Sequence, residues 1–161
     1  MNFLLKIFFL FIIFSSFCYS NSIDYLLVDK SNRELNLIKN KKIFKKFKIS
    51  LGFEPIGKKI KQGDGKTPEG LYFIDKKIRN SSYFLALQIS YPNPWDTRQA
   101  LANGYLPGGQ IMIHGLPNKN YDDSFHNKKN DWTEGCIAVS NKEMEYLWKI
   151  VKVDTPILIV R

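Results

Sequence analysis

Short stretches of alternating apolar and polar residues follow one another after residue 20, and they restrict this chain to a mainly β fold. Successive side chains of a strand point to opposite faces, so a repeat of two residues indicates a half-buried strand. Strands are predicted over residues 24–30, 35–39, 43–51, 71–78, 85–90, 111–113 and 157–160. Within 43–51 the residues expected to face the core, with Lys45 as the exception, are Ile43, Phe47, Ile49 and Leu51.

One helix is well marked near the C-terminus. Its apolar stripe repeats at helical spacing and consists of Met144, Leu147, Trp148 and Val151. Ser140 and Glu143 form the capping-box pattern that begins a helix. A second, short helix is predicted over residues 95–103. The 161 residues suffice for one domain. We therefore expect a mainly β (α+β) domain with the C-terminal helix packed on its sheet.

The first twenty residues, Met1 to Ser20, have the pattern of a secretory signal: a basic start, a short apolar run and an exit with small residues. We expect cleavage after Ser20, which leaves residues 21–161 as the domain, located outside the cytoplasm. A transmembrane anchor is the alternative, but the apolar stretch is shorter than the roughly 20 residues that cross a bilayer. Lipidation at Cys18 is a third interpretation, although bulky Phe17 precedes it. Membrane contact is expected only through this leader.

Once Cys18 is removed, Cys136 is the only thiol of an exported chain. Such a thiol is either a reactive group or a small buried hydrophobe. Two histidines and one thiol offer no usual metal-ligand spacing, so we expect no metal and no cofactor. The formal net charge of +9 fits solubility or attraction to an anionic extracytoplasmic polymer. Nucleic-acid binding would rest on that charge alone, and no nucleic-acid motif is present.

His114 and Cys136 form the strongest candidate for chemistry. His114 ends the apolar run 111–113, and Cys136 follows Gly135 at the far end of a long polar loop. A thiol needs a base at neutral pH, and an imidazole can take its proton and return it to a leaving group. A glycine turn can also direct backbone N–H groups at an oxyanion. A structural role for His114 and the use of His126 as the base remain alternatives.

Three separated blocks give the chain a family resemblance. They are Gly65-Lys66-Thr67-Pro68-Glu69-Gly70, Ile113-His114-Gly115, and Thr133-Glu134-Gly135-Cys136-Ile137 with the later Asn141. In this order they resemble the L,D-transpeptidase (YkuD) catalytic domain, over residues 23–161. The resemblance implies a YkuD-like β-sandwich or barrel of mixed sheet that acts on the stem peptides of peptidoglycan. We expect the Thr67-Pro68 block itself to form a structural turn.

The resemblance also assigns roles. Cys136 is the nucleophile, His114 its base, and the carbonyl of Gly115 orients the imidazole. Backbone N–H groups of Glu134, Gly135 and Cys136 form the oxyanion hole. Attack on the third stem residue releases a terminal D-amino acid and leaves a thioester, which an amine or water resolves.

Two neighbours of Cys136 complete the expected site. Thr133 and Trp132 are expected near the substrate, although Trp132 could instead pack the loop.

Three features depart from the family pattern. Glu134 replaces a frequent second histidine, Ala138 replaces a frequent arginine, and the spacer between His114 and Thr133 is slightly long. In these features the chain resembles a sub-branch of small periplasmic members of the family. Some relatives there cut bonds, including the link between peptidoglycan and an outer-membrane lipoprotein. A transpeptidase, a hydrolase of either kind and a non-catalytic wall-binding module therefore remain open.

Overall fold

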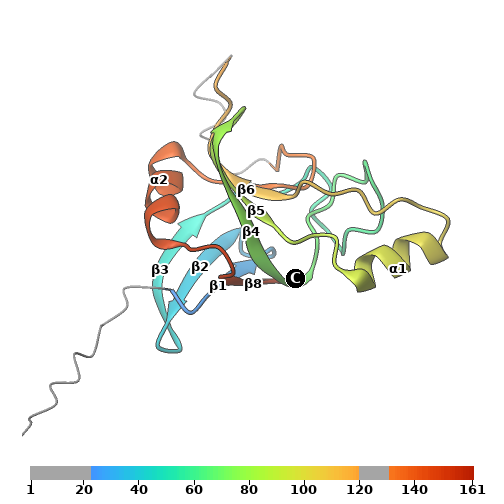
Figure 1. The fold of residues 1–161 in the computed structure, drawn as a ribbon, viewed down its shortest axis with the longest axis horizontal. Helices are drawn as coiled ribbons and strands as arrows, with labels where there is room; N and C mark the ends of the chain where they lie inside the picture. The colour runs from blue at the N-terminus through green and yellow to red at the C-terminus, as the bar shows by residue number, and fades with distance from the viewer. Residues whose placement is uncertain (1–22, 120–130) are drawn as a thin grey trace, which may run out of the picture.

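The computed structural model describes residues 23–119 and 131–161. Figure 1 shows the order of the elements. The strands are β1 Tyr25–Asp29, β2 Glu34–Lys39, β3 Lys42–Lys48, β4 Gly70–Ser81, β5 Phe84–Ile89, β6 Met112–His114, β7 Ile137–Ala138 and β8 Pro156–Val160. The helices are α1 Pro94–Ala102 and α2 Asn141–Ile150. The predicted leader, residues 1–20, and the candidate base His126 lie outside the described residues.

The strands form one mixed sheet in the order β3-β2-β1-β8-β4-β5-β6-β7. Neighbours are antiparallel except β1 with β8 and β6 with β7, which are parallel. The long strand β4 joins the two halves, because its start pairs with β8 and the rest pairs with β5. Isolated bridges from Ser50 to Ala138 and from Gly52 to Thr133 then connect the chain after β3 to the β7 region. The predicted mainly β, mixed-sheet fold is confirmed.

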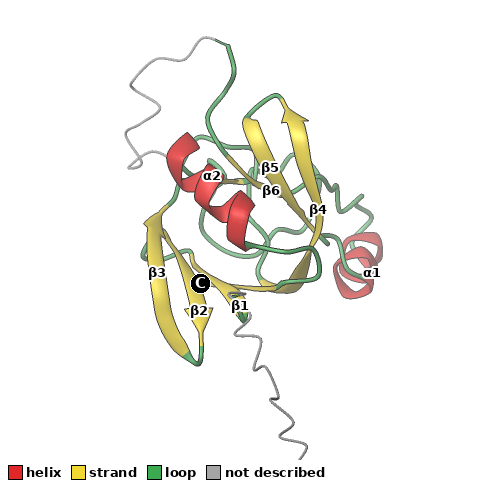
Figure 2. Ribbon diagram, turned by 60° about the vertical axis from the view of Figure 1, so that its left-hand side comes forward, coloured by secondary structure: helices red, strands yellow, loops and turns green. Residues whose placement is uncertain are grey.

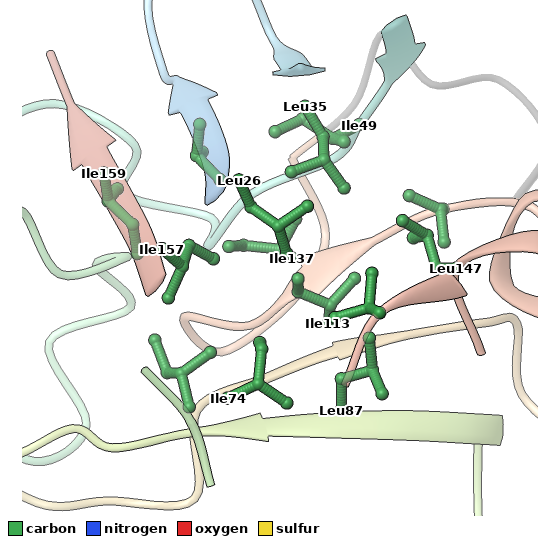
Figure 3. Close-up of a cluster of buried hydrophobic side chains, with 14 of the residues drawn as sticks. Leu26, Leu35, Ile49, Ile74, Leu87, Ile113, Ile137, Leu147, Ile157 and Ile159 are labelled. Carbon is green, nitrogen blue, oxygen red and sulfur yellow. The ribbon is translucent and has the colours of Figure 1, made fainter. Parts of the chain in front are cut away.

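Helix α2 covers the concave side of this sheet. Figure 2 shows it lying between the β2–β3 hairpin and strands β5 and β6. Met144 and Leu147 are fully buried, and Val151 just after the helix is buried as well. Leu147 packs in a cluster with Ile113 and Leu87 of the neighbouring strands (Figure 3). The predicted apolar stripe is therefore the face that closes the core.

Both helices begin as capping boxes. The Ser140 hydroxyl accepts from the backbone N–H of Glu143, whose carboxylate accepts from the N–H of Ser140. Asn93 and Asp96 make the same reciprocal pair before α1. These contacts satisfy N–H groups that a helix start leaves unpaired. Both predicted helices are confirmed to within a few residues.

The prediction that Ile43 faces the core is wrong. Its side chain is 56 % exposed, whereas Phe47 on the same strand is buried. The ladder shifts register after Leu37, and Ile43 pairs with Ile38 near the end of the hairpin. Phe47 lies further along β3, where its ring meets Tyr146 of α2 edge-on at 5.9 Å. The helix thus buries β3 near the end of the strand, at Phe47, and leaves the start of the strand exposed.

Lys45, the exception in the apolar pattern of β3, has a structural explanation. Its ammonium lies 4.0 Å from the centre of the Tyr146 ring and 5.6 Å from that of Phe47. The long stem of a lysine can cover apolar surface while the charge stays in water.

Within the described residues, no helix is long and apolar enough to cross a bilayer.

Replacing Leu147 by Ala should lower the free energy of unfolding by about 2 to 5 kcal/mol, because the substitution leaves a cavity at a fully buried position. Urea denaturation measures the change. Glu145→Ala is the control on the exposed side of the same helix, and it should stay within about 0.5 kcal/mol of the parent. Equal destabilisation by the two variants would contradict the packing of α2 described above.

Candidate active site

Strand register places Cys136 and His114 on one face of the sheet. In the parallel pair β6–β7, Ile113 is opposite Ile137 and His114 is opposite Ala138. One step back along the chain, Cys136 is level with Met112. Because side chains alternate between faces, Cys136 and His114 share a face, while Ile113 and Ile137 point into the core, where both are fully buried. The strand register thus places the two residues that the sequence analysis selected on one face of neighbouring segments.

The imidazole of His114 is held in a fixed orientation. Its Nδ1 lies 2.7 Å from the carbonyl oxygen of Gly115, and the side chain is almost completely buried. A carbonyl only accepts hydrogen bonds, so Nδ1 carries the proton of the neutral ring and Nε2 is the basic nitrogen. Burial lowers the pKa of His114, and the Gly115 carbonyl opposes this in part.

Gly115 is fixed by close contacts on both sides. Its N–H donates to the carbonyls of Tyr83 and Leu85, at 3.1 and 3.2 Å. A Cβ at this position would lie 2.5 Å from Oδ1 of Asn141, which accepts from the N–H of Leu116 at 2.8 Å. No side chain fits there without moving the start of α2. The asparagine of the sequence motif therefore holds the chain that follows His114.

Aromatic side chains enclose the imidazole. The ring of Tyr83 lies 4.6 Å from that of His114, and Trp132 meets it nearly edge-on at 5.7 Å. The two aromatic rings are themselves 6.1 Å apart. Trp132 thus lies beside the imidazole, next to the turn that carries Cys136. Tyr83 was missed by the sequence analysis, because it lies in the β4–β5 turn, far from both motifs along the chain.

Cys136 is half-buried, and its surroundings act on the thiol in opposite directions. Its Sγ donates to the carbonyl of Gln110 at 3.6 Å. Burial raises the pKa of this thiol. The backbone N–H of Met112 and the charge of Lys59 lower the same pKa, and the charge of Glu134 raises it. The largest of these influences, burial, favours the uncharged form of the thiol.

The turn before Cys136 is closed by Thr133. Its hydroxyl donates to the carbonyl of Cys136 at 2.7 Å and accepts from the N–H of Gly135 at 3.1 Å. Thr133 itself is buried, while Glu134 is exposed. The N–H of Gly135 is thus directed at Thr133, and the expected oxyanion donors reduce to the N–H groups of Glu134 and Cys136. Thr133 acts on the shape of the turn.

Two glycines allow the loop after β3 to lie against this turn. A Cβ on Gly52 would lie 2.1 Å from the Gly65 carbonyl and 2.9 Å from the Cα of Gly135. A Cβ on Gly135, whose φ is 126°, would lie 2.6 Å from the carbonyl of Lys66. Backbone approaches this close exclude any side chain. The loop over residues 52–70 is therefore one wall of the site.

Asp64 organises that loop from within. Its carboxylate accepts from the backbone N–H groups of Ile60, Lys61 and Lys66, at 2.8 to 3.1 Å. It also pairs with the buried ammonium of Lys59 at 2.7 Å, and Lys59 donates to the carbonyl of Lys61. These hydrogen bonds lower the pKa of Asp64 against the effect of its burial, which is the largest single influence. The sequence offered no signal for this pair beyond a lysine-rich loop.

The Thr67-Pro68 block is structural, as expected. Thr67 is fully buried, and its hydroxyl accepts from the N–H of Gly52 at 3.1 Å. The buried ammonium of Lys30 reaches over to the carbonyls of Thr67 and Gly57 and to the carboxylate of Glu69. The loop is thus anchored to the end of β1. Among the described residues, no group of acidic, histidine or cysteine side chains could hold a metal ion.

The fold and the site together define a mixed β-domain with a cysteine and an oriented histidine on one face of neighbouring strands. The family model of the YkuD L,D-transpeptidase catalytic domain matches residues 23–159. The chain belongs to this family.

The relatives are longer proteins. The putative L,D-transpeptidase YafK of Escherichia coli K12 is 28 % identical over 133 residues, which cover 79 % of this chain and 46 % of YafK. A mutant of the helical cell shape determining protein Pgp2 from Campylobacter jejuni superposes with a TM-score of 0.68 at 27 % identity, covering 88 % of this chain and 48 % of Pgp2. Bd1075 of Bdellovibrio bacteriovorus superposes with a TM-score of 0.60 at 27 % identity, covering 86 % of this chain and 48 % of Bd1075. The chain thus spans about half the length of these relatives.

Charge substitutions on the two sides of Cys136 should move its thiol pKa in opposite directions. Lys59→Gln should raise the pKa, and Glu134→Gln should lower it, because one removes a positive and the other a negative charge. The rate of alkylation by iodoacetamide as a function of pH measures this pKa. Lys58→Gln is the matched control, since Lys58 pairs with Asp96 instead. Shifts of the same sign in the first two variants would contradict these electrostatics.

Acidification should destabilise the protein through His114. Above pH of about 6.5 the ring is neutral in both the folded and the unfolded chain. Below this pH the His114 ring of the unfolded chain binds a proton, whereas the buried ring of the folded chain stays neutral because its pKa is lowered. The free energy of unfolding therefore falls as the pH is lowered. Urea denaturation between pH 7.5 and 5.5 should show a shallower loss in His114→Gln than in the parent. Equal slopes in the parent and His114→Gln would refute the assignment.

Proposed function

We propose that this protein is an exported cysteine acyltransferase that acts on the stem peptides of peptidoglycan through a thioester on Cys136. The observation that carries the proposal is the shared face of Cys136 and His114, with Nδ1 of the imidazole held by the Gly115 carbonyl. Membership of the L,D-transpeptidase family supports the substrate class. The secretory pattern of residues 1–20 supports a periplasmic location.

The acylation step uses groups described above. Nε2 of His114 takes the thiol proton as Sγ attacks the carbonyl carbon of the third stem residue, and the electron pair of that carbonyl moves onto its oxygen. The N–H groups of Glu134 and Cys136 stabilise this oxyanion. Collapse of the intermediate breaks the amide bond, and His114 returns the proton to the amine of the departing D-amino acid. A thioester remains on Cys136.

The fate of the thioester separates two candidate activities. An amine acceptor gives a crosslink or a protein attachment, and water gives a carboxypeptidase or a cleaving enzyme, including one that releases a wall-attached lipoprotein. Position 138 favours the second group, because the buried Ala138 offers no cation for an acceptor or donor carboxylate. One structural relative at 27 % identity is named as a cell shape determining protein, which suits remodelling of existing wall.

Digestion of purified sacculi tests the proposal. Mass spectrometry of the released muropeptides should show a change with the processed protein that is absent with Cys136→Ala. His114→Ala should reduce it by about 10²- to 10⁴-fold, since general base catalysis contributes on that scale. His126→Ala should have a mild effect. New 3–3 crosslinks identify a transpeptidase, whereas loss of terminal D-alanine or release of a bound protein identifies a hydrolase.

A second readout separates chemistry from binding. The intact mass of the protein after incubation with a stem tetrapeptide or a carbapenem-type acyl donor should increase by the acyl group, and only when Cys136 is present. Binding to sacculi without any Cys136-dependent product or adduct would overturn the enzymatic proposal in favour of a wall-binding module. Full activity of His114→Ala with an inactive His126→Ala would move the base to His126.

A further inference from the structure

The β2–β3 hairpin projects from the body of the domain. Its strands meet in a two-residue turn in which Asn40 and Lys41 both have positive φ, 51° and 61°. Such a turn follows the natural twist of a hairpin and makes it a firm element. Figures 1 and 2 both show the end of the hairpin at the edge of the molecule, pointing away from β6, which lies nearer the middle. We call residues 39–45 the hairpin tip.

Two adjacent large apolar side chains are exposed on the tip. Ile43 is 56 % exposed and Phe44 is 53 % exposed. As neighbours on a strand they point to opposite faces, so both faces of the projecting hairpin present apolar surface. Single exposed hydrophobic residues are ordinary, but a pair at the end of a projection is typical of a contact surface.

The same tip is positively charged. Lys46 and Lys48, further along β3, both pair with the single carboxylate of Glu34, at 2.7 and 2.9 Å. Among the ion pairs of the described residues, none involves Lys41 or Lys42.

The surroundings do not cancel this charge. Lys39 lies near the ring of Phe44, 5.9 Å from its centre. The acid contacting the turn is Asp24, whose carboxylate accepts from the N–H of Asn40 at 2.6 Å. In the part of the chain that the structure describes, this carboxylate stands against Lys41 and Lys42, and Lys45 is folded over Tyr146.

Protection of an edge strand from pairing would explain the lysines of the hairpin tip but not its exposed apolar side chains. Lysines on an edge discourage pairing with a second sheet, and β3 is an edge strand. Exposed Ile43 and Phe44 work against such protection, so the combination needs another reason. Apolar side chains flanked by lysines match the boundary of an anionic bilayer, where acyl chains lie beneath phosphate groups. A hydrophilic polyanion would use the lysines alone.

We propose that the hairpin tip docks the domain onto an anionic phospholipid bilayer, with Ile43 and Phe44 entering the interface and the lysines contacting lipid phosphates. The path of the chain is consistent with this. The N–H of Asp24 donates to the carbonyl of Ile38 beside the tip, so the first described residues of the chain lie at this end of the domain. The sequence predicted membrane contact only through the leader, and the tip is a second contact that does not depend on it. Docking by the tip leaves the candidate active site on the far side.

Vesicle sedimentation tests this docking. The processed protein, with its N-terminus determined by mass spectrometry, is mixed with vesicles of phosphatidylcholine containing 30 % phosphatidylglycerol or of phosphatidylcholine alone. Binding should require the anionic lipid and weaken as salt is raised. Lys41→Glu/Lys42→Glu should reduce it about tenfold or more, because two charges at the surface are reversed. Ile43→Ser/Phe44→Ser should reduce it several-fold without unfolding, as both side chains are exposed.

Lys76→Glu/Lys152→Glu is the matched control, with the same charge change at exposed positions away from the tip. It should bind as the parent does. Equal losses in this control and in the tip variant would replace the proposal by a response to net charge. Full binding by Ile43→Ser/Phe44→Ser would indicate a polyanion site instead, and no binding to anionic vesicles would end the proposal. The rate of Cys136 alkylation should be unchanged in all variants, so the outcome is independent of the proposed enzymatic function.

Discussion

The pairing of β6 with β7 is the constraint on which the site depends. Only two residues of β7 are in the ladder, yet a shift of one position would turn Cys136 into the core and Ile137 outwards. Burial of Ile113 and Ile137 therefore fixes the register (Figure 3). The position of the thiol relative to the imidazole is a consequence of core packing, and the free energy that holds it comes from apolar burial. The candidate active site thus needs few dedicated contacts of its own.

What the register does not fix is the conformation of the turn that carries Cys136. Residues 133–136 have no helix or strand to hold them, so the support comes from the loop over residues 52–70. Gly52 and Gly135 let the two backbones touch, and Asp64 holds the loop by four hydrogen bonds to its own backbone and to Lys59. The ion pair of Asp64 and Lys59 can be buried here because its charged atoms also make hydrogen bonds to the backbone. The same pair places a positive charge where the thiol senses it.

Local patterns predicted the elements and the two reactive residues. The capping boxes and the helical stripe are short-range signals, and the alternation of β-strands needs only neighbouring residues. Such signals could not predict Tyr83 or Lys59. Tyr83 lies near the site because of the β4–β5 turn, and Lys59 because of a loop whose path is set by long-range contacts. Ile43 was misplaced for a related reason. Alternation marks a strand but does not tell where the covering helix ends, and α2 reaches only as far as Phe47.

The electrostatics bear on how the proposed nucleophile would be activated. Burial raises the pKa of Cys136 and lowers that of His114, so each group favours its uncharged form. A preformed thiolate–imidazolium pair would require both shifts to be reversed. In the proposed mechanism the proton would instead move from Sγ to Nε2 as the sulfur attacks, and the Gly115 carbonyl would stabilise the charge that then develops on the ring. Since Glu134 opposes the thiolate and Lys59 favours it, substrate that neutralises or displaces Glu134 would itself assist the attack. If the proposed function holds, reactivity would then rise only with a stem peptide bound, which would suit the single thiol of the expected exported protein.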